Sequence, residues 1–318
     1  MMNVKLAFAA VTLALTTHAY GYEGYSVFSD AINQDEVLAH TPRLVEVAKQ
    51  VGDTPTVGGA YRYDEQGRVT QRDYADSTFD YHYDADGRLA SARALMKHGD
   101  INSYVRHTKE NFVSEYHYDT DGKVVKEMKR IFDDFAISLD QTPRAAYKIK
   151  YRYDEQNRLV KRTQIPLSGD DMANLEFHYR YHDDGRLRKI IEIKKRPQRE
   201  KSVLLLQYHD NGEIRTATQT LFGKGTQVFE LEYVADPDQV YGIYYVDPVK
   251  EWKVDMDFFG LAFHPIQSIK KTVANQVTQY QYRYVNDESD RLPDSLTLTL
   301  TQPSGASVDI EYRMANQP

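Results

Sequence analysis

The chain has no cysteine among its 318 residues, which excludes disulfide bridges, thiolate metal sites and a lipid-modified cysteine anchor. It also lacks an excess of basic residues, since 40 Lys and Arg stand against 47 Asp and Glu. Proteins that bind nucleic acid usually carry clustered positive charge, and along this sequence only residues 189–201 form such a cluster. We interpret this cluster as a solvated strand and turn around Pro197, and expect no nucleic acid partner.

A long hydrophobic run is absent as well. The apolar stretch from Leu6 to Leu15 is about ten residues long, whereas a transmembrane helix needs about twenty. Lys5 precedes this stretch and Ala19 closes a short polar segment after it, which predicts a secretory signal peptide over residues 1–19. The alternative, a membrane anchor, would need a longer stretch. We therefore expect a periplasmic or secreted protein that does not span the membrane.

Tyrosine is abundant instead, with 25 residues, and many of them belong to copies of one short pattern. The clearest copy is Phe79–Leu89, which reads Phe-Asp-Tyr-His-Tyr-Asp-Ala-Asp-Gly-Arg-Leu. Further copies begin at Tyr61, Tyr116, Tyr151 and Tyr179, a degraded copy runs from Leu206 to Ile214, and a last one begins at Tyr282. Copies of one pattern predict a structure built from one repeated unit.

Each copy alternates aromatic and polar residues. Successive side chains of a strand point to opposite faces, so Tyr81 and Tyr83 share one face and His82 lies on the other. The pattern then continues as Asp-x-x-Gly or Asp-x-x-Asn, which is typical of a tight hairpin turn. Each copy therefore predicts one β-hairpin. The turn residues that should adopt positive φ are Gly87, Gly122, Gly185 and Asn157.

The segment Tyr83–Leu89 resembles the Tyr-Asp-x-x-Gly-Arg-Leu signature of the YD-repeat family, also called Rhs-type repeats. The resemblance is clear over residues 60–215 and weaker over 216–313. It implies hairpins aligned side by side in a long strip of sheet, which in large members winds into a shell around a toxic polypeptide. Some members are described as carbohydrate-binding. This chain continues from Asp247-Pro248 as Val-Lys, without the family's Asp-Pro-x-Gly-Leu boundary, so it resembles a short exported member without a toxin region.

We expect an all-β fold, an antiparallel meander of about sixteen to twenty strands that curls into an open barrel or a spiral sheet. Such a sheet hides its aromatic face by curling, so most repeat tyrosines should be substantially buried. The residues that test this are Tyr63, Tyr81, Tyr83, Tyr118, Tyr151, Tyr153, Tyr179 and Tyr181. An outer-membrane barrel is the alternative architecture, but it would place tyrosine along whole lipid-facing strands.

The expected domains are the signal peptide over residues 1–19, an irregular and helical cap over 20–55, and a single YD-repeat-like β domain over 56–318. The helix of the cap is predicted over Thr41–Gly52. Thr41 suits the N-cap, the following proline suits the first helical position, and Gly52 is a plausible stop. We expect this short N-terminal helical segment to protect the first edge of the sheet.

The residues Tyr244, Tyr245 and Trp252 form the candidate ligand-binding site, because exposed aromatic rings stack on sugars and apolar surfaces. The same segment could equally be the closing core of the sheet. We identify no catalytic, cofactor-binding or metal-binding residue. The Asp-x-Asp-Gly at Asp84 does not fit a calcium loop, since Arg93 would stand at the twelfth position.

Two classes of function remain open from the sequence. The first is a non-catalytic exported binding or scaffold protein, with a glycan or protein partner in the cell envelope. The alternative is a cell-envelope hydrolase with an unrecognised carboxylate site. The repeat favours the first class, because repeated surfaces provide extended contacts. A column of His82, His117 and His178 on the polar face is interpreted as solvated strand positions rather than a metal site.

Overall fold

The computed structural model describes eleven ranges of the chain, separated by short gaps and by one long gap. These ranges are 43–51, 54–66, 68–73, 77–97, 110–133, 138–169, 173–195, 199–234, 266–285, 295–301 and 307–317. The expected signal peptide over 1–19 and the candidate residues Tyr244, Tyr245 and Trp252 lie outside them. Within the described ranges, no helix is long and apolar enough to cross a membrane.

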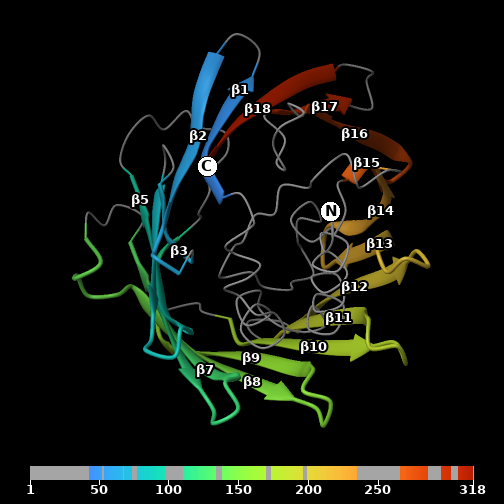
Figure 1. Ribbon diagram of the computed structural model, residues 1–318. Helices are drawn as coiled ribbons and strands as arrows, with labels where there is room; N and C mark the ends of the chain where they lie inside the picture. The colour runs from blue at the N-terminus through green and yellow to red at the C-terminus, as the bar shows by residue number, and fades with distance from the viewer. Residues whose placement is uncertain are drawn as a thin grey trace, which may run out of the picture.

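The described residues form one antiparallel sheet of eighteen strands (Figure 1). The strands are β1 Arg43–Val51, β2 Thr54–Tyr63, β3 Val69–Asp73, β4 Ser77–Tyr83, β5 Leu89–Met96, β6 Asn111–Tyr118, β7 Val124–Phe132, β8 Ala145–Tyr153, β9 Leu159–Ser168, β10 Leu175–Tyr181, β11 Leu187–Lys194, β12 Glu200–Tyr208, β13 Ile214–Leu221, β14 Gly225–Tyr233, β15 Ile266–Val273, β16 Gln276–Val285, β17 Ser295–Thr301 and β18 Ser307–Gln317. The all-β meander that the sequence predicts is confirmed.

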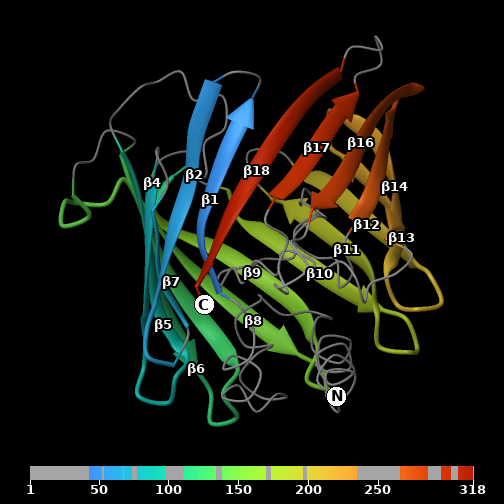
Figure 2. The same ribbon diagram turned by 45° about the horizontal axis from the view of Figure 1, so that its top comes forward.

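Consecutive strands are neighbours throughout the meander, and its two ends are joined. β1 pairs with β2 on one side and with β18 on the other, over Arg43–Val51 in the latter ladder. Figure 2 shows β1 lying between these two strands. The sheet is therefore continuous around a ring (Figure 1).

The helix expected over Thr41–Gly52 is wrong for Arg43–Val51, which is strand β1. Its apolar spacing fits a helix, but β1 is also rich in valine, which suits a strand. The long-range partners decide the outcome: Val47 pairs with Gly59 of β2 and with Met314 of β18. A helix here would leave the edges of both strands unpaired, and such edges are a liability.

Seven of the hairpins carry a β-bulge at the motif tyrosine, whereas the ladder between β16 and β17 has none. In the ladder between β4 and β5, His82 pairs with Ser91 but Tyr83 pairs with Leu89, so Ala90 is the extra residue. The same shift occurs at Tyr63, Tyr118, Tyr153, Tyr181, Tyr208 and Tyr233. A bulge bends its strand and increases the local twist. Because the bulges recur at equivalent positions, their bends add up and favour closure of the sheet.

One face of the sheet is buried and continuous from strand to strand. Tyr81 and Tyr179 are each 2% exposed, whereas His82 lies on the opposite face and is exposed. A single core cluster extends from Val69 on β3 to Ile269 on β15. All eight tyrosines of the expected set belong to this core or pack against it, with three buried and five half-buried. This confirms the expected burial of the aromatic face.

The hairpin turns of the repeats lie at one end of the sheet. In a meander, successive turns alternate between the two ends, so the turns after even-numbered strands share an end. We call this end the motif rim. It carries the turns β2–β3, β4–β5, β6–β7, β8–β9, β10–β11 and β12–β13. Residues at equivalent positions in different repeats are thereby brought into rows around the ring.

Candidate functional site

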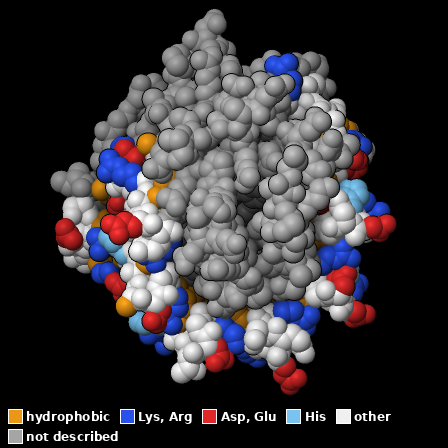
Figure 3. Space-filling model, viewed as in Figure 1, with side chains coloured by type: hydrophobic (Ala, Val, Ile, Leu, Met, Phe, Trp, Pro, Cys, Tyr) orange, Lys and Arg blue, Asp and Glu red, His pale blue; other side chains and the backbone are white. Residues whose placement is uncertain are grey.

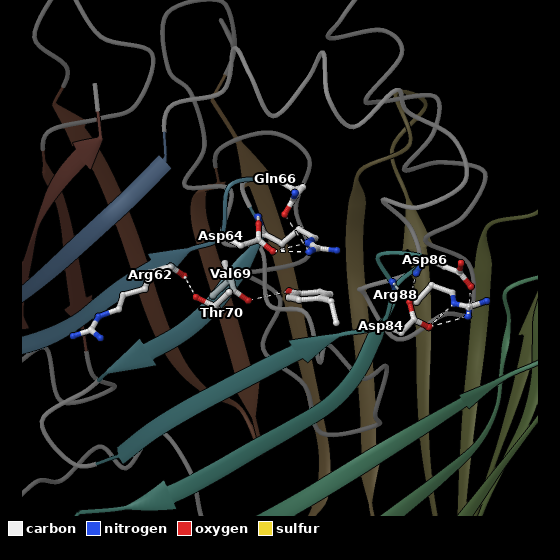
Figure 4. A network of polar contacts seen from close by, with 10 residues as sticks. Arg62, Asp64, Gln66, Val69, Thr70, Asp84, Asp86 and Arg88 are labelled. Atoms are coloured by element: carbon white, nitrogen blue, oxygen red, sulfur yellow. Dashed lines mark hydrogen bonds and ion pairs between the residues drawn. The ribbon is translucent and has the colours of Figure 1, made fainter.

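An aspartate directly after the motif tyrosine holds the turn together in the hairpins that begin on β2, β4, β6 and β8. Asp84 accepts hydrogen bonds through Oδ1 from the backbone N–H groups of Asp86 at 3.0 Å and Arg88 at 2.9 Å. Its Oδ2 accepts a bond of 2.8 Å from Nε of Arg88 (Figure 4). Asp64 and Asp154 hold Arg68 and Arg158 in the same way. The aspartate therefore fixes both the turn and the direction of the arginine.

Glycine and asparagine occupy the left-handed position of these turns, as the sequence predicts. The φ angles are 80° at Gly87, 81° at Gly122, 89° at Gly185 and 64° at Asn157. Side chains with a Cβ are strained in this region, and asparagine tolerates it best among non-glycine residues. The hairpin assignment is thus confirmed at four turns.

The hydroxyl of the motif tyrosine forms a hydrogen bond to the backbone of the preceding hairpin. The hydroxyl of Tyr83 donates a hydrogen bond of 2.9 Å to the carbonyl oxygen of Val69, the residue that closes the preceding motif. The same bond joins Tyr118 to Leu89, Tyr153 to Val124, Tyr181 to Leu159, Tyr208 to Leu187 and Tyr233 to Ile214, at 2.6–2.9 Å. We call this bond the tyrosine latch. Consecutive hairpins are therefore joined by side chains as well as by the backbone ladder.

The motif arginine lies over the ring of the following motif tyrosine. The guanidinium carbon of Arg68 is 4.3 Å from the ring centroid of Tyr83, and that of Arg88 is 4.9 Å from the centroid of Tyr118. Arg158 over Tyr181 and Arg186 over Tyr208 repeat this arrangement at 4.8 and 5.0 Å. These are cation–π contacts. A ring whose face and hydroxyl are both engaged is poorly placed to stack on a sugar.

A second row of polar side chains lies on the buried face, three residues after the motif leucine or valine. Arg72 occupies this position on β3, donates to the hydroxyl of Tyr81 and lies over the ring of Phe79 at 4.7 Å. Glu127 occupies it on β7 and accepts hydrogen bonds from Ser114 at 2.6 Å and Tyr151 at 2.7 Å. Our sequence reasoning did not identify this row. Its signal is a charged residue at an inward-facing strand position.

The carboxyl groups of the motif accept hydrogen bonds within the turns. Burial opposes ionisation of Asp84, but its hydrogen bonds from Arg88 outweigh this effect and lower the pKa of the carboxyl group. In the turn where His182 follows the tyrosine, Asp184 takes over the aspartate role, and its bond from Arg186 lowers the pKa of its carboxyl group. A carboxyl group with a lowered pKa and a fixed arginine is a poor general acid.

The histidine column of the polar face is separated into individual solvated positions. His82 and His117 are exposed, and His178 is half-buried with Nε2 at 3.4 Å from Glu176. Across the part of the chain that the structure describes, no three His, Asp or Glu side chains form a group that could hold a metal ion. The described residues thus form no metal-binding group around these histidines.

The outer face carries one well-organised charge network. Glu176 on β10 accepts hydrogen bonds from Lys195 at 2.7 Å and from Lys161 on β9 at 3.1 Å. Its side chain is 13% exposed. Lys195, followed by Lys161, lowers the pKa of the Glu176 carboxyl group from 4.5 to about 2. The network links the ends of three neighbouring strands.

The hairpins, joined from repeat to repeat by the tyrosine latch, form a β scaffold built from one repeated unit. Residues 40–166 match the family model described as Teneurin YD-shell, which confirms the YD-repeat resemblance. A comparison with curated proteins finds none that matches this chain.

Two solved structures illustrate the distant likeness in fold. The first, TcdB2-TccC3-Cdc42, has 13% identity and a TM-score of 0.39, with 82% of this chain and 13% of that chain covered. The second is a porin-like protein from Bacteroides uniformis, with 11% identity and a TM-score of 0.43, covering 86% of this chain and 96% of that one. This chain spans only 13% of the first structure's chain, and neither likeness is close enough to indicate a function.

Proposed function

We propose that this chain is a non-catalytic exported binding or scaffold protein that recognises a glycan or a protein surface in the cell envelope. The observation that carries the proposal is the use of the motif side chains within the sheet. Tyrosine, aspartate and arginine of the repeat bond to one another and to the backbone, as at Asp84, Arg88 and Tyr118. These groups build the scaffold and leave contacts with a partner to the outward-facing residues.

Those outward-facing residues recur once per hairpin. The residue before each motif tyrosine is exposed in every repeat from β2 to β14, and on β16 as well. These residues are Arg62, His82, His117, Arg152, Arg180, Gln207, Glu232 and Arg283. Figure 3 shows basic and acidic side chains interspersed along the margin of the described residues. A row of long polar side chains suits an extended partner, which a repeat scaffold presents naturally.

A glycan array and a pull-down from envelope extract, run beside glycosidase and peptidase screens, test the proposal. We expect a saturable glycan or protein partner and no turnover. The alternative, a cell-envelope hydrolase, would show turnover that one Asp or Glu substitution abolishes. Glu127→Gln is the first variant to examine, because this carboxyl group is buried at 2% exposure. Turnover lost in a folded Glu127→Gln variant would overturn the proposal.

Export is the second part of the proposal. Cell fractionation and N-terminal sequencing of the natural protein measure it directly. We expect a periplasmic or secreted mature chain that begins at Tyr20, after the predicted signal peptide. A mature chain that retains its first nineteen residues in the cytoplasm would contradict this part.

A further inference from the structure

Like charges face each other in three cross-strand pairs on the outer face. Lys126 of β7 pairs with Lys150 of β8, and Arg152 of β8 pairs with Lys161 of β9. Arg180 of β10 pairs with Lys189 of β11. Strand alternation places all six on the side opposite the buried Tyr151 and Tyr179. We call these six residues the cation rows.

Most of this charge is uncompensated. Lys150, Arg152 and Arg180 are exposed, and Lys126 and Lys189 are half-buried. Among the described residues, only Lys161 of the six forms an ion pair, at 3.1 Å from Glu176. Glu176 is already shared with Lys195. The cation rows therefore form a positive surface over β7–β11 on a chain whose formal net charge is −7.

Such an arrangement is unfavourable for the scaffold alone. Like charges directly opposite each other destabilise a pair of strands, and opposite charges at the same positions would stabilise it. Other ladders of the outer face show the favourable choice: Lys270 of β15 lies opposite Glu230 of β14, with Nζ at 3.1 Å from the carboxylate. Three repulsive pairs in one region of the sheet, set against the opposite charges of Lys270 and Glu230, indicate a binding role.

We propose that the cation rows bind an anionic polysaccharide, a chain with carboxylate or sulfate groups on successive sugars. This inference rests on the proposed function and names the class of glycan. Neighbouring strands are about 4.8 Å apart, so the rows span about 19 Å across five strands. A linear polymer crossing the strands meets a cation on each of them. The guanidinium groups of Arg152 and Arg180 can bind carboxylate or sulfate through two parallel hydrogen bonds.

The surface suits a polysaccharide better than a nucleic acid. Proteins that bind single strands stack the bases on exposed aromatic rings. On β7–β11, the rings of Phe132, Tyr147, Tyr151, Phe177 and Tyr179 are buried and those of Tyr153 and Tyr181 half-buried. The described outward-facing neighbours of the cation rows are aliphatic or polar residues such as Thr163 and Ile191. The imidazole rings of His117, opposite Lys126, and His178, opposite Lys161, also lie on this face. Charge without outward-facing tyrosine, phenylalanine or tryptophan rings on β7–β11 fits a polymer that is recognised by its anionic groups.

The test compares two variants of the full-length chain that lose the same charge. The first combines Lys150→Gln, Arg152→Gln and Arg180→Gln. The control combines Arg93→Gln, Arg215→Gln and Lys224→Gln, which are exposed positions on β5, on β13 and in the turn between β13 and β14. Titration calorimetry measures binding of polygalacturonate, neutral dextran and duplex DNA at about 50 mM and about 200 mM NaCl.

We expect the unmodified chain to bind polygalacturonate, and to bind it more weakly at the higher salt concentration. Dextran should show no measurable binding. The cation-row variant should lose affinity at least about tenfold, while the control stays within about twofold. The melting temperature of the cation-row variant should be unchanged or higher, because repulsion is removed. A lower melting temperature together with weaker binding would indicate a structural role and overturn the inference.

Other outcomes also decide the question. Equal losses in both variants, or duplex DNA bound as tightly as polygalacturonate, would overturn the assignment to polysaccharide. If polygalacturonate does not bind while both variants still capture the same partner from envelope extract, the inference fails and the proposed function stands. If the unmodified chain captures no partner at all, the proposed function fails with it.

Discussion

The hydroxyl of Tyr118 donates a hydrogen bond of 2.7 Å to the carbonyl oxygen of Leu89, 29 residues earlier in the chain. Arg88, next to Leu89, lies over the same tyrosine ring at 4.9 Å. One repeat thus contacts the tyrosine of the next both at the face of the ring, through Arg88, and at the hydroxyl, through the carbonyl of Leu89. Each residue type of the Tyr-Asp-x-x-Gly-Arg-Leu pattern has a physical task in this contact.

The tyrosine latch should be measurable by removing a single oxygen. Tyr118→Phe keeps the ring under Arg88 but leaves the carbonyl of Leu89 without this donor, so we expect a loss of about 1–2 kcal/mol in the free energy of unfolding. Tyr208→Phe removes the equivalent bond to Leu187 and should show a similar loss. Denaturant unfolding measures both. Unfolding midpoints equal to that of the unmodified chain would show that the latch does not stabilise the sheet.

Removing a tyrosine hydroxyl on the buried face should lower the free energy of unfolding more than removing a tyrosine latch. Tyr151 donates to Glu127, a carboxyl group that is 2% exposed and whose other donor is Ser114. We expect Tyr151→Phe to cost about 2–3 kcal/mol, more than Tyr118→Phe, because the acceptor is a buried carboxyl group. A double-mutant cycle with Glu127→Gln isolates the coupling. Additive effects of the two substitutions would contradict the contact.

The turn positions should rank substitutions by their tolerance of positive φ. Gly87→Val should destabilise more than Gly87→Asn, by about 1–2 kcal/mol, and Asn157→Gly should be neutral or mildly stabilising. A Cβ at Gly87 would also meet a guanidinium nitrogen of Arg68 at 3.1 Å, whereas one at Gly122 meets no atom within 4 Å. Gly122→Val and Gly122→Asn are therefore the cleaner pair, and thermal unfolding should give the same ranking there.

Glu176 should make stability depend on pH in acid. Its folded-state pKa, about 2, lies below the ordinary value of 4.5, so its contribution is full above about pH 4.5 and disappears as the pH falls toward 2. We expect Glu176→Gln to cost about 1–3 kcal/mol at pH 6 and only about a quarter of that near pH 2.5. Urea unfolding at both pH values measures the difference. A difference in stability that is as large at pH 2.5 as at pH 6 would contradict the assignment.

Proline should reveal whether Arg43–Val51 is a central strand. Lys49 pairs with Thr56 of β2 and Tyr312 of β18. Lys49→Pro removes a backbone donor between two neighbours and should cost about 3 kcal/mol or more, while Lys49→Ala should cost less than about 1 kcal/mol. Thermal unfolding of the two variants compares them directly. Equal stability of both would show that β1 is not held in the sheet.

The local part of the fold could be predicted because its causes are local. Alternation and turn chemistry predicted the hairpins, and the turn residues expected at positive φ, such as Gly87 and Asn157, have it. β1 was missed because its apolar spacing fits a helix, and its partners lie about 10 and 265 residues away along the chain.

The candidate site shows the same division between local and long-range causes. The aspartate's role in the turn is visible in four consecutive residues. The contact between Arg88 and the ring of Tyr118 cannot be predicted from one repeat, because the two residues come together only when neighbouring hairpins pair in the sheet. The cation rows also depend on alignment: Arg152 and Lys161 are nine residues apart in the chain and directly opposite in the sheet. Tyr244, Tyr245 and Trp252 stay a prediction, since they lie outside the described residues.

Every one of the eighteen described strands has a neighbour on both sides, because β1 meets β18. Among the described strands, a partner strand therefore finds no exposed sheet edge to which it could add. Growth by one further hairpin would have to open the β1–β18 ladder and widen the whole circumference. The number of repeats is thus a property of the complete ring, unlike the open-ended stacking of a solenoid.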